Sequence, residues 1–417
     1  MPILNFSRFV RATTLAALSV LALVAQTTAQ AADAKAYVSN FKDNSVSVID
    51  TGRAAVVATI PVAAGPHGMA LSPDGRTLYV SGDGSAQVSV IDTASDSVSR
   101  FLEVGKSPHG LAMAPDGKRL LVAVYAEDRL GLWDTASGTQ VGSIPVAKPH
   151  TVTILPDGKK AYVASQQPGK FNLTVIDLLN ASVLREVTLD KPPRDIEAAF
   201  DGRAVYITVA GENAVLVLDP RSDSIVARVP TGVSPHIATL VKGAGVGTVV
   251  VQGPGELTLF DPATNTVLRS ISVGKQPHWA ATNAGGTTAY VSNEGSNDLS
   301  IVDLASGAVR TVPVGTAPRK VVVQQSAPAS AGSGAVKVSI ANFAFAPGEL
   351  RIQAGQSVTW VNDDGAPHGL AHADGAKGAD LLLPGASVSR RYDTAGSFDY
   401  VCSVHPYMTG KVVVSAR

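Results

Sequence analysis

Short apolar runs, each closed by an aspartate, recur through the first 325 residues of the chain. The closing aspartates are spaced by 42 or 43 residues, and they are Asp50, Asp92, Asp134, Asp177, Asp219, Asp261 and Asp303. Each opens a turn in which its carboxylate can accept hydrogen bonds from the following amides. A second apolar run, such as Tyr-Val-Ser-Gly at 79–82, lies about twelve residues upstream of each aspartate. A period of 40 to 45 residues with four short strands predicts a β-propeller blade.

The two ends of this repeat array carry incomplete copies. Residues 36–40 match the second strand of a blade, and residues 317–325 match a lone first strand. Pairing of these segments would complete one blade from both ends and leave the ring without an open edge. We therefore expect a seven-bladed propeller over residues 32–325. The Tyr-Val-Ser-Asn runs at 37–40 and 290–293 and the Ser-Pro-Asp-Gly turn at 72–75 resemble the YVTN-repeat family of β-propellers.

The rest of the chain differs in character. Residues 326–334 are rich in Ser, Ala and Gly, which predicts a flexible linker. Residues 335–417 alternate in the manner of a small β-sandwich. We expect strands at 336–341, 350–352, 357–362, 387–392, 396–402 and 410–414, and a bend at 343–347. The predicted fold class is all-β, with a seven-bladed propeller followed by a small β-sandwich.

The single cysteine of the chain, Cys402, opens the run Cys-Ser-Val-His-Pro-Tyr-Met at 402–408. A lone cysteine forms no intramolecular disulfide. A thiolate and two imidazoles, with a weak axial thioether, are instead the ligands of a trigonal blue-copper site. The second imidazole is expected from His368, which follows the strand predicted at 357–362. The alternative is that Cys402 is a buried core thiol beside incidental histidines.

The whole tail resembles the cupredoxins, and its 402–408 loop, followed by the strand at 410–414, is most similar to amicyanin. This resemblance implies one type 1 copper with four ligands, which are His368, Cys402, His405 and Met408. It also implies that electrons enter or leave at His405, with Pro406 and Tyr407 bordering this port.

One position departs from the cupredoxin pattern. These proteins commonly carry a polar residue, often asparagine, directly after the first histidine ligand, where it fixes the ligand loops. Here that residue is Gly369. His372 lies nearby, and we expect it at the surface; support for the site and alternative ligation are the other interpretations.

The other five histidines all lie in the propeller and all follow a proline at the start of the first strand of a blade. Arginine takes this position in the two remaining blades. We call the seven residues the channel ring: His67, His109, His150, Arg194, His236, His278 and Arg319. Pointing inward, they would encircle one mouth of the central channel. Three interpretations remain open, namely a structural Pro-His-Gly repeat, an anion site and a second metal site. Arginine does not ligate metals, and Asp195 and Glu197 would offset some positive charge.

Composition and the N-terminus limit the partners and the location. The 34 basic residues equal the 34 acidic ones, without a basic stripe, which excludes a nucleic-acid surface. Residues 1–31 carry Arg8 and Arg11 ahead of an apolar run at 16–25 and small residues at 29–31. This pattern predicts a cleaved signal peptide and a periplasmic location. Because the run is too short to anchor the chain in a bilayer, no membrane insertion of the mature chain is expected.

These features predict a periplasmic copper-binding electron-transfer protein, a carrier in preference to an enzyme. Its propeller would dock a redox protein such as a dehydrogenase, a reductase or a cytochrome. One alternative is a copper-dependent oxidoreductase with a substrate or a second metal at the channel ring. Another is a periplasmic metal chaperone that carries its cargo there. The outline resembles nitrous-oxide reductase, but one cysteine excludes the two-cysteine copper centre of that family.

Overall fold

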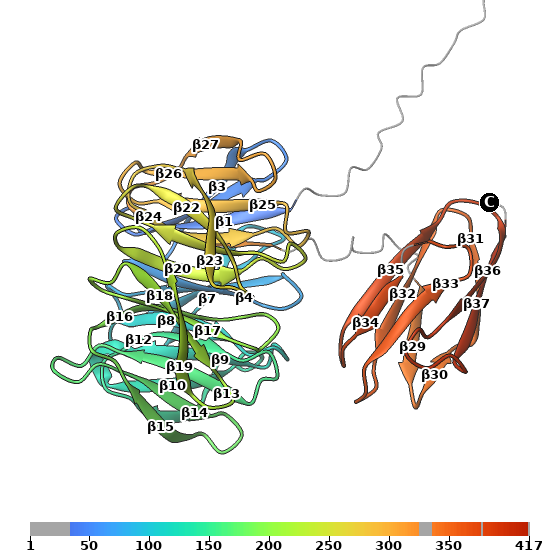
Figure 1. Ribbon diagram of the computed structural model, residues 1–417, viewed down its shortest axis with the longest axis horizontal. Coiled ribbons are helices and arrows are strands. Elements are labelled where there is room, and N and C mark those ends of the chain that lie inside the picture. Colours follow the sequence, from blue (N-terminus) through green and yellow to red (C-terminus); the bar gives the residue numbers. More distant parts are fainter. Residues whose placement is uncertain (1–33, 325–335, 377, 416–417) are drawn as a thin grey trace, which may run out of the picture. The chain divides into compact units, whose positions relative to one another are not determined.

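The computed structural model describes residues 34–324, 336–376 and 378–415. The predicted signal peptide at 1–31 and the predicted linker at 326–334 lie outside these residues. Within them the regular structure consists of strands, apart from the single 3-10 turn η1 at Tyr125–Glu127. The predicted all-β fold class is thereby confirmed (Figure 1). No helix in the described part of the chain has the length and hydropathy needed to cross a bilayer.

Strands β1 to β28 form seven four-stranded antiparallel sheets. Their bounds are β1 Lys35–Asn40, β2 Ser45–Asp50, β3 Ala55–Pro61, β4 Pro66–Leu71, β5 Thr77–Gly82, β6 Gln87–Asp92, β7 Ser97–Glu103, β8 Pro108–Met113, β9 Arg119–Val124, β10 Arg129–Asp134, β11 Gln140–Pro145, β12 Pro149–Ile154, β13 Lys160–Ser165, β14 Asn172–Asp177, β15 Ser182–Thr188, β16 Pro193–Ala198, β17 Val205–Val209, β18 Ala214–Asp219, β19 Ser224–Pro230, β20 Pro235–Leu240, β21 Gly247–Val251, β22 Glu256–Asp261, β23 Thr266–Ser272, β24 Pro277–Thr282, β25 Thr288–Asn293, β26 Asp298–Asp303, β27 Val309–Pro313 and β28 Pro318–Val323.

The seven sheets are the blades of a closed propeller. Six blades are meanders of consecutive strands, such as β4-β5-β6-β7. The first strands β4, β8, β12, β16, β20, β24 and β28 each contact the first strand of the next blade, and β28 contacts β4. A circle of neighbouring first strands around one axis is the arrangement that the repeat period predicts.

The seventh blade is built from both ends of the repeat array. Its strand order is β28-β1-β2-β3, so the last repeat strand pairs with the first. In this antiparallel seam Val321 lies opposite Val38, and both side chains are fully buried. The split blade predicted from the sequence is confirmed, and the ring closes without a free inner edge.

The repeated aspartates end the third strand of each blade and fix the turn that follows. Asp92 Oδ1 accepts hydrogen bonds from the amides of Ala94 and Ser95, both at 2.9 Å. Other repeat positions join neighbouring blades. Lys160 Nζ and the hydroxyl of Tyr162 both bond to the Asp223 carboxylate of the following blade, at 3.0 and 2.5 Å. The repeat therefore encodes both the turn within a blade and the contact between blades.

The tail forms a sandwich with a separate hydrophobic core, built only from residues between Val336 and Val414. Its strands are β29 Val336–Ala341, β30 Ala344–Ala346, β31 Glu349–Gln353, β32 Gln356–Asn362, β33 His368–His372, β34 Ala379–Leu382, β35 Ser387–Tyr392, β36 Gly396–Val401 and β37 Thr409–Ser415. The two sheets have the orders β30-β29-β32-β35 and β31-β37-β36-β33-β34. The predicted bend at 343–347 contains the short strand β30, whereas β33 and β34 were not predicted from the sequence.

Candidate metal centre

The predicted ligands lie on a strand and a loop that meet at one edge of the sandwich sheet. His368 is the first residue of β33, whereas Cys402 directly follows β36. The backbone amide of Cys402 donates to the Met408 carbonyl at 3.0 Å, and the Met408 amide donates to the His405 carbonyl at 3.0 Å. These two bonds fold residues 402–408 into a compact loop that returns the chain to β37.

Three potential ligand atoms gather in this loop. Sγ of Cys402 lies 3.7 Å from Nδ1 of His368 and 3.7 Å from Nδ1 of His405, and the two nitrogens are 3.2 Å apart. Metal bonds of about 2.0–2.3 Å to nitrogen and sulfur produce edges of this length around one ion. A thiolate with two imidazoles suits copper. The donor set and its spacing therefore fit the metal that the motif predicted.

Met408, the predicted axial ligand, is only 3% exposed and belongs to the sandwich core. His368 and Cys402 are fully buried, while His405 is partly exposed. Low solvent access raises the strength of electrostatic interactions at such a site. The structure thus encloses the sulfur and one imidazole and leaves the second imidazole at the surface.

The sulfur of Cys402 accepts two backbone hydrogen bonds. The amides of Gly369 and His405 both donate to Sγ at 3.3 Å. Donors of this kind stabilise a thiolate. Gly369 therefore serves the site through its backbone, although it lacks the polar side chain usual at this position. The side-chain amide of Asn362 holds the loop instead, donating to the carbonyls of Ala366 and Leu382 at 2.8 Å each.

Asp364 was not singled out from the sequence, yet it contacts a predicted ligand. Its Oδ2 lies 2.9 Å from Nε2 of His368, and its carboxylate also accepts the amides of Asn342 and Phe343 at 2.8 and 2.9 Å. The Phe343 amide is the largest cause that lowers the pKa of this carboxyl. A carboxylate on the far nitrogen of an imidazole fixes its tautomer and ring orientation. Nothing in the Asp-Asp-Gly run at 363–365 reveals this contact.

Comparisons with known proteins identify this part of the chain. Residues 333–415 match the model of copper binding proteins of the plastocyanin/azurin family. Amicyanin-alpha of Methylorubrum extorquens is 38% identical over 96 residues, which cover 22% of this chain and 76% of that protein. The chain belongs to the plastocyanin/azurin family. Amicyanin of Paracoccus versutus is 34% identical over 103 residues, covering 23% of the chain and 78% of that protein.

Family membership confirms the predicted copper-binding, electron-transfer cupredoxin domain. The propeller has its own matches. Residues 21–119 match a YNCE-like beta-propeller model. The structure of Kuenenia stuttgartiensis hydrazine synthase superposes with a TM-score of 0.60 at 22% identity, covering 64% of this chain and 92% of that chain. At this identity the likeness shows the fold alone, and it confirms the predicted propeller.

The expectation for His372 was wrong. Its side chain is 7% exposed, and its ring centroid lies 5.4 Å from that of Trp360 and 6.2 Å from that of Tyr400. Burial lowers the pKa of His372. This histidine belongs to the aromatic core of the plastocyanin/azurin domain because it lies on β33, a strand that the sequence analysis missed.

The five histidines of the channel ring converge. His67, His109 and His150 stack at successive centroid distances of 3.9 Å, and His236 and His278 form a second stack at 3.9 Å. The stacks approach each other at His67 and His278, whose centroids are 5.6 Å apart. Burial is the main cause that lowers the pKa of all five imidazoles, to about 4 for His109 and about 3 for His236.

Both arginines of the channel ring already have partners. Arg319 pairs with Glu294 at 2.9 Å and donates to Nε2 of His278 at 2.9 Å. Arg194 donates to Ser234 Oγ at 2.7 Å and to Gln252 Oε1 at 2.9 Å. The charge of Arg319 is therefore compensated within the protein, and the interpretation as an anion site rests on Arg194.

The repeated Pro-His-Gly pattern also has a structural role. A Cβ on Gly68 would lie 2.3 Å from the His109 carbonyl, and one on Gly110 would lie 2.7 Å from the His150 carbonyl. The hydroxyl of Ser81 donates to the same His109 carbonyl at 2.6 Å. Adjacent blades thus approach closely at these glycines, as the structural interpretation expects.

The described part of the chain contains one group of three or more potential metal ligands from histidine, cysteine and acidic residues. That group is His368, Cys402 and His405. The channel ring does not form such a group, so the geometry gives no support to a second metal there.

Proposed function

We propose that this protein is a periplasmic electron carrier in which His368, Cys402, His405 and Met408 hold one type 1 copper. The observation that carries the proposal is the triangle of ligand atoms with edges of 3.2, 3.7 and 3.7 Å. Bound copper would supply one-electron Cu(II)/Cu(I) chemistry. The protein supplies buried ligands in fixed positions, with two amides on the sulfur and a carboxylate on one imidazole.

Electrons would pass through the exposed edge of His405. Pro406 and Tyr407 beside it are exposed, and the Tyr407 ring centroid lies 6.0 Å from that of His405. Phe343 is also solvent-accessible, and its ring packs edge-on against His405 at 5.1 Å. This apolar rim suits a brief contact with a redox protein, because apolar surface associates without strong charge pairing.

The propeller would serve as the docking platform for that redox partner. Residues 326–334 connect the two domains in the sequence. A tether raises the effective concentration of the copper domain at any partner that the propeller binds. Loop-bearing faces of rigid scaffolds are common places for such contacts.

Copper titration of the full chain tests the copper site. We expect an intense visible absorption from a Cu(II)–thiolate bond, which Cys402→Ser abolishes and His405→Gln strongly alters. His372→Gln is the matched control, since this histidine lies outside the ligand triangle, and it should keep the absorption. Copper binding without that absorption would overturn the assignment.

Metal analysis separates the carrier from its alternatives. One firmly held copper per chain is expected for the carrier. Two metals per chain, with the second lost in the His109→Ala/His236→Ala variant, would favour the oxidoreductase. Rapidly exchanging metal at the channel ring without a reversible redox wave would favour the chaperone.

A further inference from the structure

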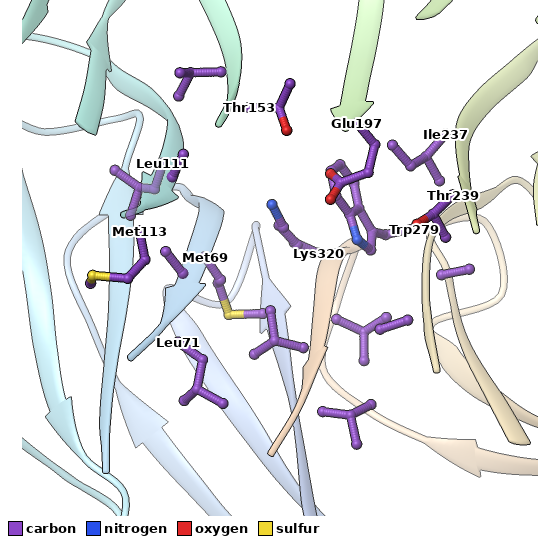
Figure 2. A pocket seen from close by; sticks show the side chains of 18 of the residues that line it. Met69, Leu71, Leu111, Met113, Thr153, Glu197, Ile237, Thr239, Trp279 and Lys320 are labelled. Carbon is purple, nitrogen blue, oxygen red and sulfur yellow. The ribbon is translucent and has the colours of Figure 1, made fainter. Parts of the chain in front are cut away.

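The propeller axis contains a cavity that neither the copper site nor the channel ring explains. It has a volume of about 390 Å³, and the first strands of all seven blades contribute to its lining. We call it the axial cavity. Figure 2 shows the apolar side chains of Met69, Leu71 and Met113 on one side and that of Ile237 on the opposite side. Cavities of this size and character bind small molecules.

Two opposite charges face the axial cavity among these apolar groups. Figure 2 shows the Lys320 ammonium and the Glu197 carboxylate on facing strands, beside the Trp279 ring. Lys320 Nζ lies 4.0 Å from the centroid of that ring, a cation–π distance. Glu197 and Lys320 belong to β16 and β28, which are not neighbours around the ring.

The ammonium and the carboxylate influence each other without direct contact. Burial raises the pKa of Glu197, and the charge of Lys320 counteracts that shift. Burial lowers the pKa of Lys320, and the charges of Glu197 and, to a smaller extent, Asp195 counteract it. Within the described residues, neither side chain forms a hydrogen bond or an ion pair at 4.0 Å or less. Asp195, the other acid nearby, is 2% exposed, and its Oδ1 accepts the Ile196 amide at 2.8 Å. Within the described residues, Glu197 and Lys320 therefore leave a gap between two charges that lack a hydrogen-bonded or ion-paired partner, although the ammonium lies over the Trp279 ring.

The two charges on either side of the gap indicate which charged groups a ligand of the axial cavity would carry. A charged group held away from bulk water is costly until a partner of opposite charge reaches it. A carboxylate would satisfy Lys320 alone and an ammonium would satisfy Glu197 alone, whereas a zwitterion satisfies both. The apolar walls then favour a hydrocarbon side chain next to the charged head.

We propose that the axial cavity binds a free α-amino acid with an apolar side chain, its carboxylate on Lys320 and its ammonium on Glu197. The side chain lies against Met69, Leu71 and Met113, and Trp279 covers the head group. All these residues belong to the propeller. Amino-acid binding at the axial cavity is therefore independent of copper binding at the tail.

Isothermal titration calorimetry on the full chain tests the class of ligand. L-Leucine is compared with its two halves, 3-methylbutan-1-amine and 4-methylpentanoate, and with L-methionine and L-phenylalanine. We expect at least one of the three amino acids to bind, and each half to bind at least tenfold more weakly than leucine. Either half binding as tightly as leucine would overturn the proposal, as would no binding by any amino acid, which would mean that water fills the cavity.

Variants test the two charged residues. Glu197→Gln and Lys320→Met should each raise the dissociation constant of the amino acid at least tenfold. Glu103→Gln and Lys242→Met, which change exposed side chains, are the matched controls and should leave it unchanged. Equal affinities in all four variants would overturn the assignment of the head group.

Tryptophan fluorescence of the wild-type chain provides a second test that does not depend on the folding of Glu197→Gln or Lys320→Met. Binding should change the tryptophan emission of the wild-type chain, because Trp279 lines the axial cavity. Trp133→Phe should keep that change, since Trp133 lies in a separate packed core, and Trp279→Phe should lose it. A change that persists in Trp279→Phe would contradict binding at this place.

Discussion

At the scale of single residues, the proposed copper ligands depend on neighbouring side chains outside the ligand set. Asp364 accepts hydrogen bonds from an imidazole and from two backbone amides at once. It thereby ties His368 to the chain between β29 and β30. Removal of the carboxylate frees the imidazole and also leaves the amides of Asn342 and Phe343 without this acceptor.

We predict that Asp364→Ala lowers copper affinity by about 10- to 100-fold, the range usual for partners of metal-bound histidines. Competition with a chelator of known affinity measures this loss. Asp363→Ala is the matched control, because that neighbouring carboxylate pairs with Lys337 and Ser339 instead. Equal losses in the two variants would show that the loop as a whole, and not the His368 contact, determines affinity.

The candidate site could be predicted from the sequence only where its residues lie close together along the chain. One cysteine, one histidine and one methionine within seven residues favour a copper loop over a buried core thiol, and His368 follows by its order in the tail. The contacts of Asp364 and Asn362 depend on how turns meet after folding. The placement of Lys320 and Glu197 on opposite sides of the axial cavity depends on ring closure, so no sequence pattern reports it.

At the scale of elements, the blade repeat was the most predictable part of the molecule. Each closing aspartate ends a third strand, and the apolar runs of the second and third strands, such as β5 and β6, are buried almost throughout. In the tail, β33 and β34 were missed because residues 366–382 are rich in Gly, Ala and Asp and show no period of two. Their strand pairing comes from the sheet beside them.

Blade-to-blade contact makes a prediction at Gly68. Gly68→Ala should destabilise the propeller by about 1–3 kcal/mol, because the new Cβ would overlap a backbone carbonyl in a packed interface. Thermal unfolding measures the effect. Gly285→Ala is the control, since a Cβ there meets nothing within 4 Å, and its melting temperature should stay close to that of the wild type. A stable Gly68→Ala variant would show that the blades can separate at this point.

At the scale of the whole molecule, two features involve the entire ring, namely the seam and the channel ring. We predict that Val321→Pro lowers the melting temperature of the propeller, because proline removes an amide from the buried seam strand β28. Val309→Pro, at the first residue of the outer edge strand β27, is the control. The copper absorption should survive the seam variant, since the tail has its own core. Loss of the copper absorption together with the folded propeller in Val321→Pro would contradict separate folding of the two domains.

The channel ring predicts acid sensitivity. The folded pKa is about 4 for His109 and about 3 for His236, below the usual 6.5. Protonation therefore favours the unfolded chain. The neutral side chains of His109 and His236 contribute fully to the free energy of unfolding above about pH 6.5. This contribution is lost as the pH falls toward 4 for His109 and toward 3 for His236. Burial is the largest cause that lowers the pKa of His236, and Coulombic repulsion from Arg194, His150 and Arg319 lowers it further.

Urea unfolding of the metal-free chain at a series of pH values measures this dependence. The urea concentration at the midpoint of wild-type unfolding should decrease as the pH is lowered from neutral to about 4. In His109→Gln/His236→Gln the decline should be smaller, although the neutral-pH stability is itself reduced. An identical decline in the variant would assign the acid sensitivity to other groups.

The seam has a consequence for the order in which the molecule is made. The strand β28, which completes the seventh blade, starts at Pro318, and Gln324 still bonds to the Lys35 carbonyl at 2.8 Å. Synthesis proceeds from the N-terminus, so the ring remains open until β28, which ends at Val323, has been made. Throughout that interval β1 presents unpaired amides and carbonyls, a template for association with other chains. The incomplete chain is therefore most prone to association through this edge until its own last strand arrives.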